Sequence, residues 1–239
     1  MLTLTDIAWS AAGRPVIAGL DLVVAPAELV VMLGASGVGK TTVLRLAAGL
    51  TRPERGEVNN GFRRTSMVFQ EPRLMPWASA RDNVALVLDR LDRATARALA
   101  DSWLSRLGFT AADGDKRPGA LSGGMQARVA IARAFAVTPD LVLMDEPFAA
   151  LDFGLRRDLQ RQVRRLVRET GVAALFVTHD LTEAVSLADR IVVLAGAPAR
   201  LAADLAGLPP NSLAVVWEQA AALAHRPELA SVVAGLDAG

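Results

Sequence analysis

Two short stretches of this sequence have the residue types that hold phosphate groups. The first, GASGVGKTT at residues 34–42, matches the pattern G-x-x-x-x-G-K-[ST]. Glycines at this spacing let the backbone wrap closely around an anion, with peptide N–H groups directed at phosphate oxygens. The ammonium of Lys40 then reaches the terminal phosphates of a nucleotide, and the hydroxyl of Thr41 is a ligand for Mg²⁺. The predicted cradle comprises Gly34, Ala35, Ser36, Gly37, Val38, Gly39, Lys40, Thr41 and Thr42.

The second stretch, LSGGMQARVAIARAF at residues 121–135, opens a predicted helix with a serine and two glycines. A helix N-terminus presents unpaired N–H groups and the positive end of the helix dipole, which together suit an anion. Ser122 acting as an ordinary N-cap is the alternative. Glycines are unfavourable in a first helical turn, however, so Gly123 and Gly124 favour the close approach of another group. Since one cradle holds one nucleotide, the residues alone leave open what the second turn serves.

Two adjacent carboxylates follow a predicted buried strand in LVLMDEP at residues 141–147. In a parallel sheet, ligands bind at the carboxyl ends of the strands. Asp145 is therefore a candidate to hold Mg²⁺, directly or through water, and Glu146 is a candidate to polarise the water that attacks the γ-phosphate. The second acid favours hydrolysis over storage of a nucleotide. A solvated acidic strand end is the alternative interpretation.

Apolar runs and turn residues predict the elements that carry these motifs. Short apolar runs that end at glycine, such as ELVVML at 28–33, predict buried strands, and longer segments of helix formers predict helices. Strands that alternate with helices predict an α/β fold with a mostly parallel sheet, and the helical stretch 71–138 interrupts that alternation as a separate lobe. The predicted strands are 2–9, 16–24, 28–33, 65–70, 141–147, 172–180 and 189–196, and the predicted helices are 41–50, 82–108, 122–137, 152–169 and 213–224.

The composition excludes several classes of function. The 239 residues are 52% hydrophobic and 21% charged with a net charge of +1, which fits a folded domain and gives no electrostatic reason to expect a nucleic-acid partner. There is no cysteine, which excludes disulfides, thiol catalysis and cysteine-ligated zinc. The N-terminus lacks the features of a signal peptide, and no apolar run is long enough to span a bilayer, so we expect a soluble, intracellular chain.

The motifs and their order resemble those of ABC-type ATPase subunits. GASGVGKT (Walker A), LSGGM (the signature) and LVLMDE (Walker B) follow the family's order, together with Gln70 in VFQEP, ALD at 150–152 and THD at 178–180. The resemblance covers residues 2–196. It implies an α/β P-loop NTPase of ABC type, with a mostly parallel core sheet, N-terminal antiparallel strands and an inserted helical subdomain. The implied organisation is a single domain over 1–239, with a core of 1–70 and 139–200, a helical signature subdomain of 71–138 and a short C-terminal extension of 201–239.

In that family two ATPase domains pack head to tail, which implies an answer for the second turn. Ser122 and the amides of Gly123 and Gly124 would meet the γ-phosphate of the ATP held by the partner chain. The resemblance further implies that Asp152 lies at the dimer interface, and that His179 contacts the γ-phosphate and helps to hold Glu146 and its water in place. The implied catalytic residues are Glu146, His179 and Gln70, the implied metal ligands are Thr41, Gln70 and Asp145, and the implied cofactors are ATP and Mg²⁺.

The chain departs from the family pattern in three places. The aromatic residue that stacks on adenine in the family falls near Ala11, and the nearest aromatic residue is Trp9. Met125 and Ala127 replace residues that are more common after the signature, and Ala149 stands where many relatives have serine. None of these changes removes a catalytic group.

The segment VFQEPRLMPWASARDNVAL at 68–86 resembles the ATPase subunits of nitrate, sulfonate and taurine importers. In importers this region receives a short helix of the membrane subunit, so the apolar cluster Leu74, Met75, Pro76 and Trp77 is a candidate docking surface, with packing in the lobe's core as the alternative. The implied partners are a second copy or paired ATPase subunit, two membrane permease subunits and, indirectly, a substrate-binding protein. The implied location is the cytoplasmic face of the cell membrane. A non-transport ABC ATPase, an exporter subunit and a P-loop kinase or GTPase are the alternatives.

One further charged segment, the Arg-rich run 156–168, has helical spacing with interspersed acids. This pattern is more typical of a solvated helix face than of a nucleic-acid or lipid surface.

Overall fold

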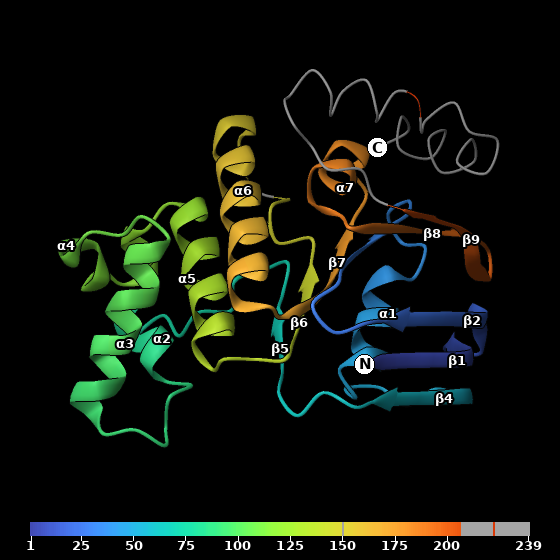
Figure 1. Cartoon of the computed structure of the whole chain (residues 1–239), viewed down its shortest axis with the longest axis horizontal. Helices are drawn as coiled ribbons and strands as arrows, with labels where there is room; N and C mark the ends of the chain where they lie inside the picture. Colours follow the sequence, from blue (N-terminus) through green and yellow to red (C-terminus); the bar gives the residue numbers. More distant parts are fainter. Residues whose placement is uncertain (150, 207–221, 223–239) are drawn as a thin grey trace. The chain divides into compact units, whose positions relative to one another are not determined.

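The computed structural model describes residues 1–149, 151–206 and 222 (Figure 1). These residues form two compact units. The first contains Met1–Phe62 and the described residues from Val167 onward, and the second contains Arg63–Leu166. Ala150 of the ALD motif lies outside the described residues, as does the predicted helix at 213–224 apart from Ala222.

The first unit is built on a sheet in which the described strands follow the order β4-β1-β2-β9-β8-β3-β7. β3 pairs in parallel with both β7 and β8, whereas β1 pairs antiparallel with both β2 and β4. The predicted α/β fold, with a parallel core and antiparallel N-terminal strands, is therefore confirmed. The strands are β1 (Leu2–Ala11), β2 (Arg14–Val24), β3 (Leu29–Leu33), β4 (Arg55–Asn60), β7 (Ala173–Thr178), β8 (Arg190–Gly196) and β9 (Ala199–Ala206).

The centre of this sheet is apolar. Every residue of β3 (LVVML) and of β7 (AALFVT) is buried. Uninterrupted apolar runs of this kind are typical of parallel strands that are covered on both faces. Helix α1 (Lys40–Ala47) follows β3 along the chain, and helix α7 (Leu181–Leu187) follows β7. Both helices therefore begin at the carboxyl edge of the sheet, where the predicted motifs lie.

Three elements of the first unit were not predicted: β4, α7 and β9. The sequence of β4, RGEVNN, is polar, and no residue of the strand is buried, so it lacks the alternation that marks a strand. Its place is fixed by pairing with β1 instead. Gly56 adopts φ 88°, and a Cβ atom there would lie 2.3 Å from the Thr5 carbonyl oxygen. Only glycine allows this close approach of the two backbones.

The second unit holds a parallel pair of strands, β5 (Thr65–Val68) and β6 (Leu141–Asp145), and a group of helices. The helix predicted over 82–108 is two helices. The first ends after Ala85, and the second begins after Asp92, whose carboxylate accepts hydrogen bonds from the N–H groups of Ala94 and Thr95 at 3.0 Å each. An aspartate N-cap starts a new helix, which explains the break. The helices are α2 (Ala80–Ala85), α3 (Arg93–Arg106), α4 (Ala111–Gly114), α5 (Gly123–Ala136) and α6 (Phe153–Thr170), with a short 3₁₀ turn at Pro118–Ala120.

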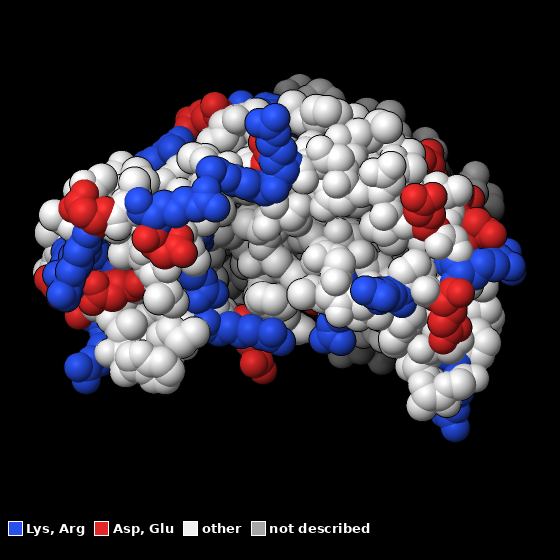
Figure 2. Space-filling model, turned by 90° about the horizontal axis from the view of Figure 1, so that it is seen from below, with Lys and Arg blue, Asp and Glu red and all other residues white. Residues whose placement is uncertain are grey.

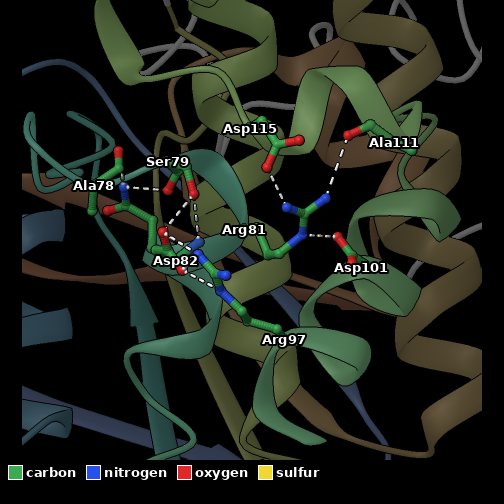
Figure 3. Close-up of polar contacts among 9 residues, drawn as sticks. Ala78, Ser79, Arg81, Asp82, Arg97, Asp101, Ala111 and Asp115 are labelled. Atoms are coloured by element: carbon green, nitrogen blue, oxygen red, sulfur yellow. Dashed lines mark hydrogen bonds and ion pairs between the residues drawn. The ribbon is translucent and has the colours of Figure 1, made fainter. Parts of the chain in front are cut away.

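Ion pairs connect α2 to α3 and to Asp115, which follows α4 (Figure 3). Arg81 donates from Nε to Asp101 on α3 at 2.5 Å and also pairs with Asp115. Arg97 on α3 makes a two-pronged contact with Asp82, at 2.8 and 3.0 Å. The hydrogen bond to Asp101 is the main cause of the raised pKa of the Arg81 guanidinium. These pairs set the position of α2 relative to α3.

Charges of both signs lie on one face of the second unit. Figure 2 shows Lys and Arg side chains interspersed with Asp and Glu side chains over its helices. In α6 the residues Leu159, Val163 and Leu166 are buried, whereas Arg161 and Arg165 are exposed, as expected for a solvated helix face. No helix in the described ranges is long and apolar enough to cross a membrane.

Candidate functional site

The first predicted cradle lies between β3 and α1. Gly37 and Gly39 adopt φ values of 78° and 116°, in the region that glycine tolerates best. A Cβ atom on Gly34 would lie 2.6 Å from the Leu194 carbonyl oxygen, so this position also requires glycine. The three glycines are thus needed to turn the chain sharply from the strand into the helix, as the sequence predicts.

Lys40 lies across this loop. Its Nζ donates hydrogen bonds to the carbonyl oxygens of Gly34 and Ala35, at 2.8 and 3.0 Å, and the residue is only 3% exposed. A buried ammonium is thereby held within the loop where the backbone turns. Such a charge beside a glycine-rich turn attracts the terminal phosphates of a nucleotide.

A cavity of about 400 Å³ adjoins the loop. It is lined by Pro15 and Val16 from β2, by loop residues 35–38, and by residues 194–198 at the end of β8. Trp9 is the aromatic residue nearest to the predicted adenine position. It lies in β1, where it pairs with Ile17 of β2, and it is not part of the cavity lining. Outside the loop, the described residues that line the cavity are therefore proline, glycine and aliphatic residues, and none of them is aromatic.

His179 lies at the same edge of the sheet as the cradle. Leu33 of β3 pairs with Thr178 of β7 in parallel register, so the residues that follow, Gly34 and His179, leave the sheet at the same end. The turn at His179 is fixed by its buried neighbour, because the Thr178 hydroxyl donates to Glu183 at 2.5 Å and accepts from the N–H of Asp180 at 3.0 Å. His179 itself is exposed. The fold thus brings together two motifs that are about 140 residues apart in the sequence.

Gln70, Asp145 and Glu146 share one edge of the second unit. Val68 of β5 pairs with Met144 of β6 in parallel register, so Asp145, the last residue of β6, and Glu146 and Gln70, which follow the two strands, lie at the same carboxyl edge. Asp145 is buried and Gln70 is exposed. Glu146 adopts φ 41°, a left-handed conformation that is uncommon for glutamate.

The signature turn, defined here as Ser122, Gly123 and Gly124, begins α5. Ser122 caps the helix by accepting a hydrogen bond from the N–H of Met125 at 3.3 Å. The two glycines differ in their surroundings. A Cβ atom on Gly123 would meet no atom within 4 Å, whereas one on Gly124 would lie 2.0 Å from a methyl group of Leu155. Packing within the unit therefore accounts for Gly124, and Gly123 is the open, exposed glycine that another molecule can approach.

Alanine substitutions at the two glycines are expected to have opposite effects on stability. Gly124→Ala would lower the free energy of unfolding by about 1–3 kcal/mol, because Leu155 must move to make room. Gly123→Ala would raise it by up to about 1 kcal/mol, because alanine favours the helix and meets open space. Urea unfolding of the two variants checks this, and equal effects would contradict the difference in packing.

The predicted docking cluster is only partly exposed. Trp77 is 70% exposed and Pro76 is also exposed, whereas Leu74 and Met75 are half-buried. Leu86, just after α2, is a further exposed apolar side chain at 57%. A tryptophan this exposed does not pack in the core of its unit. Asp152, the predicted interface residue, lies at the start of α6 and accepts a hydrogen bond from the N–H of Leu155 at 2.9 Å.

Comparison with known proteins agrees with these motifs. The sequence profile of the ABC transporter family matches residues 17–149. The chain is 44% identical over 219 residues to the aliphatic sulfonates import ATP-binding protein SsuB 3 of Nocardia farcinica, covering 92% of this chain and 86% of that protein. It is 49% identical over 180 residues to the corresponding SsuB 2 protein of Pseudomonas syringae, covering 75% of this chain and 64% of the relative. It is also 41% identical over 191 residues to the nitrate import ATP-binding protein NrtC of Synechococcus elongatus, but spans only 29% of that protein's length.

A solved structure gives the same result for the fold. The ATP-binding cassette MJ0796, determined as a dimer in a post-hydrolysis state with ADP and phosphate, aligns with a TM-score of 0.77 and 26% sequence identity. The alignment covers 86% of this chain and 98% of the cassette. A second dimeric structure of the same cassette aligns equally well. Motifs, sequence and fold lead to one conclusion: the chain belongs to the ABC transporter family, and its fold is that of the family's P-loop ATPase cassette.

Proposed function

We propose that this chain binds and hydrolyses ATP and so powers the import of a small solute, in the class of nitrate, sulfonates and taurine. The observation that carries the proposal is the cradle at the end of β3, with a buried Lys40 bonded across it and His179 leaving the sheet at the same edge. The names of the sulfonate and nitrate relatives support the importer.

Each predicted site residue has a part in the proposed reaction. The N–H groups of 34–42 and the ammonium of Lys40 bind the phosphates. Glu146 accepts a proton from the attacking water, and His179 and Gln70 orient that water and the γ-phosphate. The side chains of Gln70 and His179 are exposed and that of Glu146 is half-buried, which leaves these three accessible to a nucleotide and its water.

The donor set fits Mg²⁺. The hydroxyl of Thr41, the carboxylate of Asp145 and the side-chain carbonyl of Gln70 are hard oxygen donors, the type that Mg²⁺ prefers. The ion, when bound, neutralises the charge that develops on the phosphate oxygens.

The signature turn serves a second copy of the chain. Ser122 and the amides of Gly123 and Gly124 meet the γ-phosphate in the partner's cradle, so each site needs two chains. Two features support this part of the proposal: Gly123 is open to solvent, and MJ0796 is a dimer. Asp152 lies at the interface in this arrangement. The predicted subdivision into 1–70 with 139–200, 71–138 and 201–239 belongs to the same proposal.

The membrane partners are two permease subunits, with a substrate-binding protein that acts through them. Trp77 and Leu86 provide the exposed apolar surface that such a partner would cover. In this assembly the chain lies at the cytoplasmic face of the membrane.

Affinity purification from the native host tests the proposed function. Tagged Glu146→Gln is purified from membranes solubilised with ATP and Mg²⁺, and the co-purifying proteins are identified. A multi-span permease is the expected partner. The matched control adds Trp77→Ala to the same variant and is expected to lose the permease but retain ATP. Recovery of soluble or nucleic-acid-associated proteins alone would contradict the importer.

A further inference from the structure

Arg133, in the last turn of α5, was not singled out by any motif. Its Nη2 donates to the carbonyl oxygen of Pro72 at 2.8 Å, and its Nη1 donates to that of Arg73 at 3.0 Å. Burial lowers the pKa of this guanidinium, and the two carbonyl oxygens are its polar partners in the second unit. A planar guanidinium bridges two adjacent carbonyls in one fixed geometry, which a lysine ammonium does not reproduce.

The backbone that Arg133 holds has an unusual conformation. Arg73 adopts φ 46°, which is rare for residues other than glycine and persists only where the surroundings enforce it. The Arg73 guanidinium turns back over the ring of Phe69, 4.0 Å from its centroid. Arg133 therefore bonds to the carbonyl oxygen of a residue whose side chain packs against Phe69, the neighbour of Gln70.

The other end of this loop is held by Asn83 of α2, which is fully buried. Its side chain accepts from the N–H of Met75 at 2.7 Å and donates to the carbonyl oxygens of Met75, Ala78 and Ser79 at 3.0–3.2 Å. The ion pairs of Arg81 and Asp82 in turn hold α2 in place (Figure 3). The 72–79 loop, with Trp77 exposed near its middle, is thus fixed at one end by α5 and at the other by α2.

α5 joins this loop to the signature turn. Ser122 caps the helix, and Arg133 lies ten residues after Gly123, or about 15 Å along the helix at 1.5 Å per residue. A continuous hydrogen-bonded helix of this length moves as a rigid element. Displacement of its N-terminus is therefore carried to the atoms that bond to its last turn.

We propose that Arg133 is a positioning residue that transmits the position of the signature turn to the 72–79 loop, and hence to the partner that covers Trp77. The inference rests on the proposed function, because the start of α5 meets a nucleotide only in the ATP-bound dimer. When the partner's ATP binds at Ser122 and Gly123, α5 shifts and its guanidinium shifts the two carbonyls with it. Hydrolysis reverses the movement.

The absence of cysteine makes a single spectroscopic label straightforward. Trp77→Cys, combined with Glu146→Gln to retain ATP, is labelled with a nitroxide, and its spectrum is recorded with and without ATP and Mg²⁺. With Arg133 intact, ATP is expected to change the mobility of the label. Arg133→Lys keeps the positive charge but cannot bond to both carbonyls in the same geometry. In this variant the label is expected to be more mobile without nucleotide, and the ATP-dependent change in mobility is expected to be lost.

Two controls separate coupling from folding and from nucleotide binding. Arg93→Lys, at an exposed position of α3, should keep the full ATP-dependent change. The affinity for a fluorescent ATP analogue and the ATP-induced dimer should be the same in all variants. An unchanged ATP response in Arg133→Lys, or no response in the labelled parent when it binds ATP and dimerises, would overturn the inference. Absence of ATP binding in the labelled parent would instead overturn the proposed function, and this inference with it.

Discussion

Glu146→Gln is expected to lower the rate of ATP hydrolysis by about 10²–10⁴-fold, the usual contribution of a general base. The amide keeps the size of the side chain but cannot accept the proton of the attacking water. ATP binding should persist, because the cradle and Lys40 are unchanged, and the variant should accumulate as a dimer in ATP and Mg²⁺.

Phosphate release and light scattering measure the two effects of Glu146→Gln in the same sample. Glu57→Gln, at an exposed position of β4, is the matched control and should hydrolyse ATP at the parent rate. A Glu146→Gln variant that retains the parent rate would assign the base to another residue. A variant that remains monomeric at saturating ATP, with its membrane partners present, would contradict the shared site.

Ser122→Arg is expected to lower hydrolysis by about 10²-fold or more, because it removes a hydroxyl donor and blocks the approach of the partner's phosphate. ATP binding to the chain's own cradle should be unaffected. Ser105→Arg, at an exposed position of α3 in the same unit, is the matched control and should have no effect.

Mixing two inactive variants shows which nucleotide the signature turn serves. In a mixed dimer of Ser122→Arg with Lys40→Ala, the intact cradle of the first chain faces the intact signature turn of the second. A shared site therefore predicts that mixing restores part of the hydrolysis. If the turn served the cradle of its own chain, both sites of the mixed dimer would be defective, and mixing would restore nothing.

The elements that carry the chemistry were predictable because local chemistry determines them. The backbone of the cradle requires glycines at fixed positions, which the sequence shows directly. The runs LVVML and AALFVT are apolar throughout, which predicts buried strands. β4 was missed because its register depends on β1 and on the close approach at Gly56, which are contacts between residues distant in the sequence. The single helix predicted over 82–108 was wrong because Asp92 caps a second helix, a signal that the continuous run of helix formers obscured.

At the candidate site, too, the features that the sequence did not predict depend on contacts that form only in the folded chain. Gly123 and Gly124 look equivalent in sequence, and only the position of Leu155 separates an open glycine from a packed one. Arg133 lies in the helix that the signature turn begins, but its sequence context does not show that its guanidinium bonds to two carbonyls about 60 residues away. Asn83 was not singled out either, because its four bonds to the preceding loop depend on how that loop folds back.

The hydrogen bonds that hold the 72–79 loop separate the shape of its backbone from the identity of its side chains. All six hydrogen bonds that the side chains of Arg133 and Asn83 form with this loop are to main-chain atoms, so they do not depend on which side chains the loop carries. The exposed residues Pro76 and Trp77 can therefore be exchanged while the loop keeps its shape. Substitutions at these two positions are therefore expected to change the surface that the loop presents and to leave its backbone unchanged.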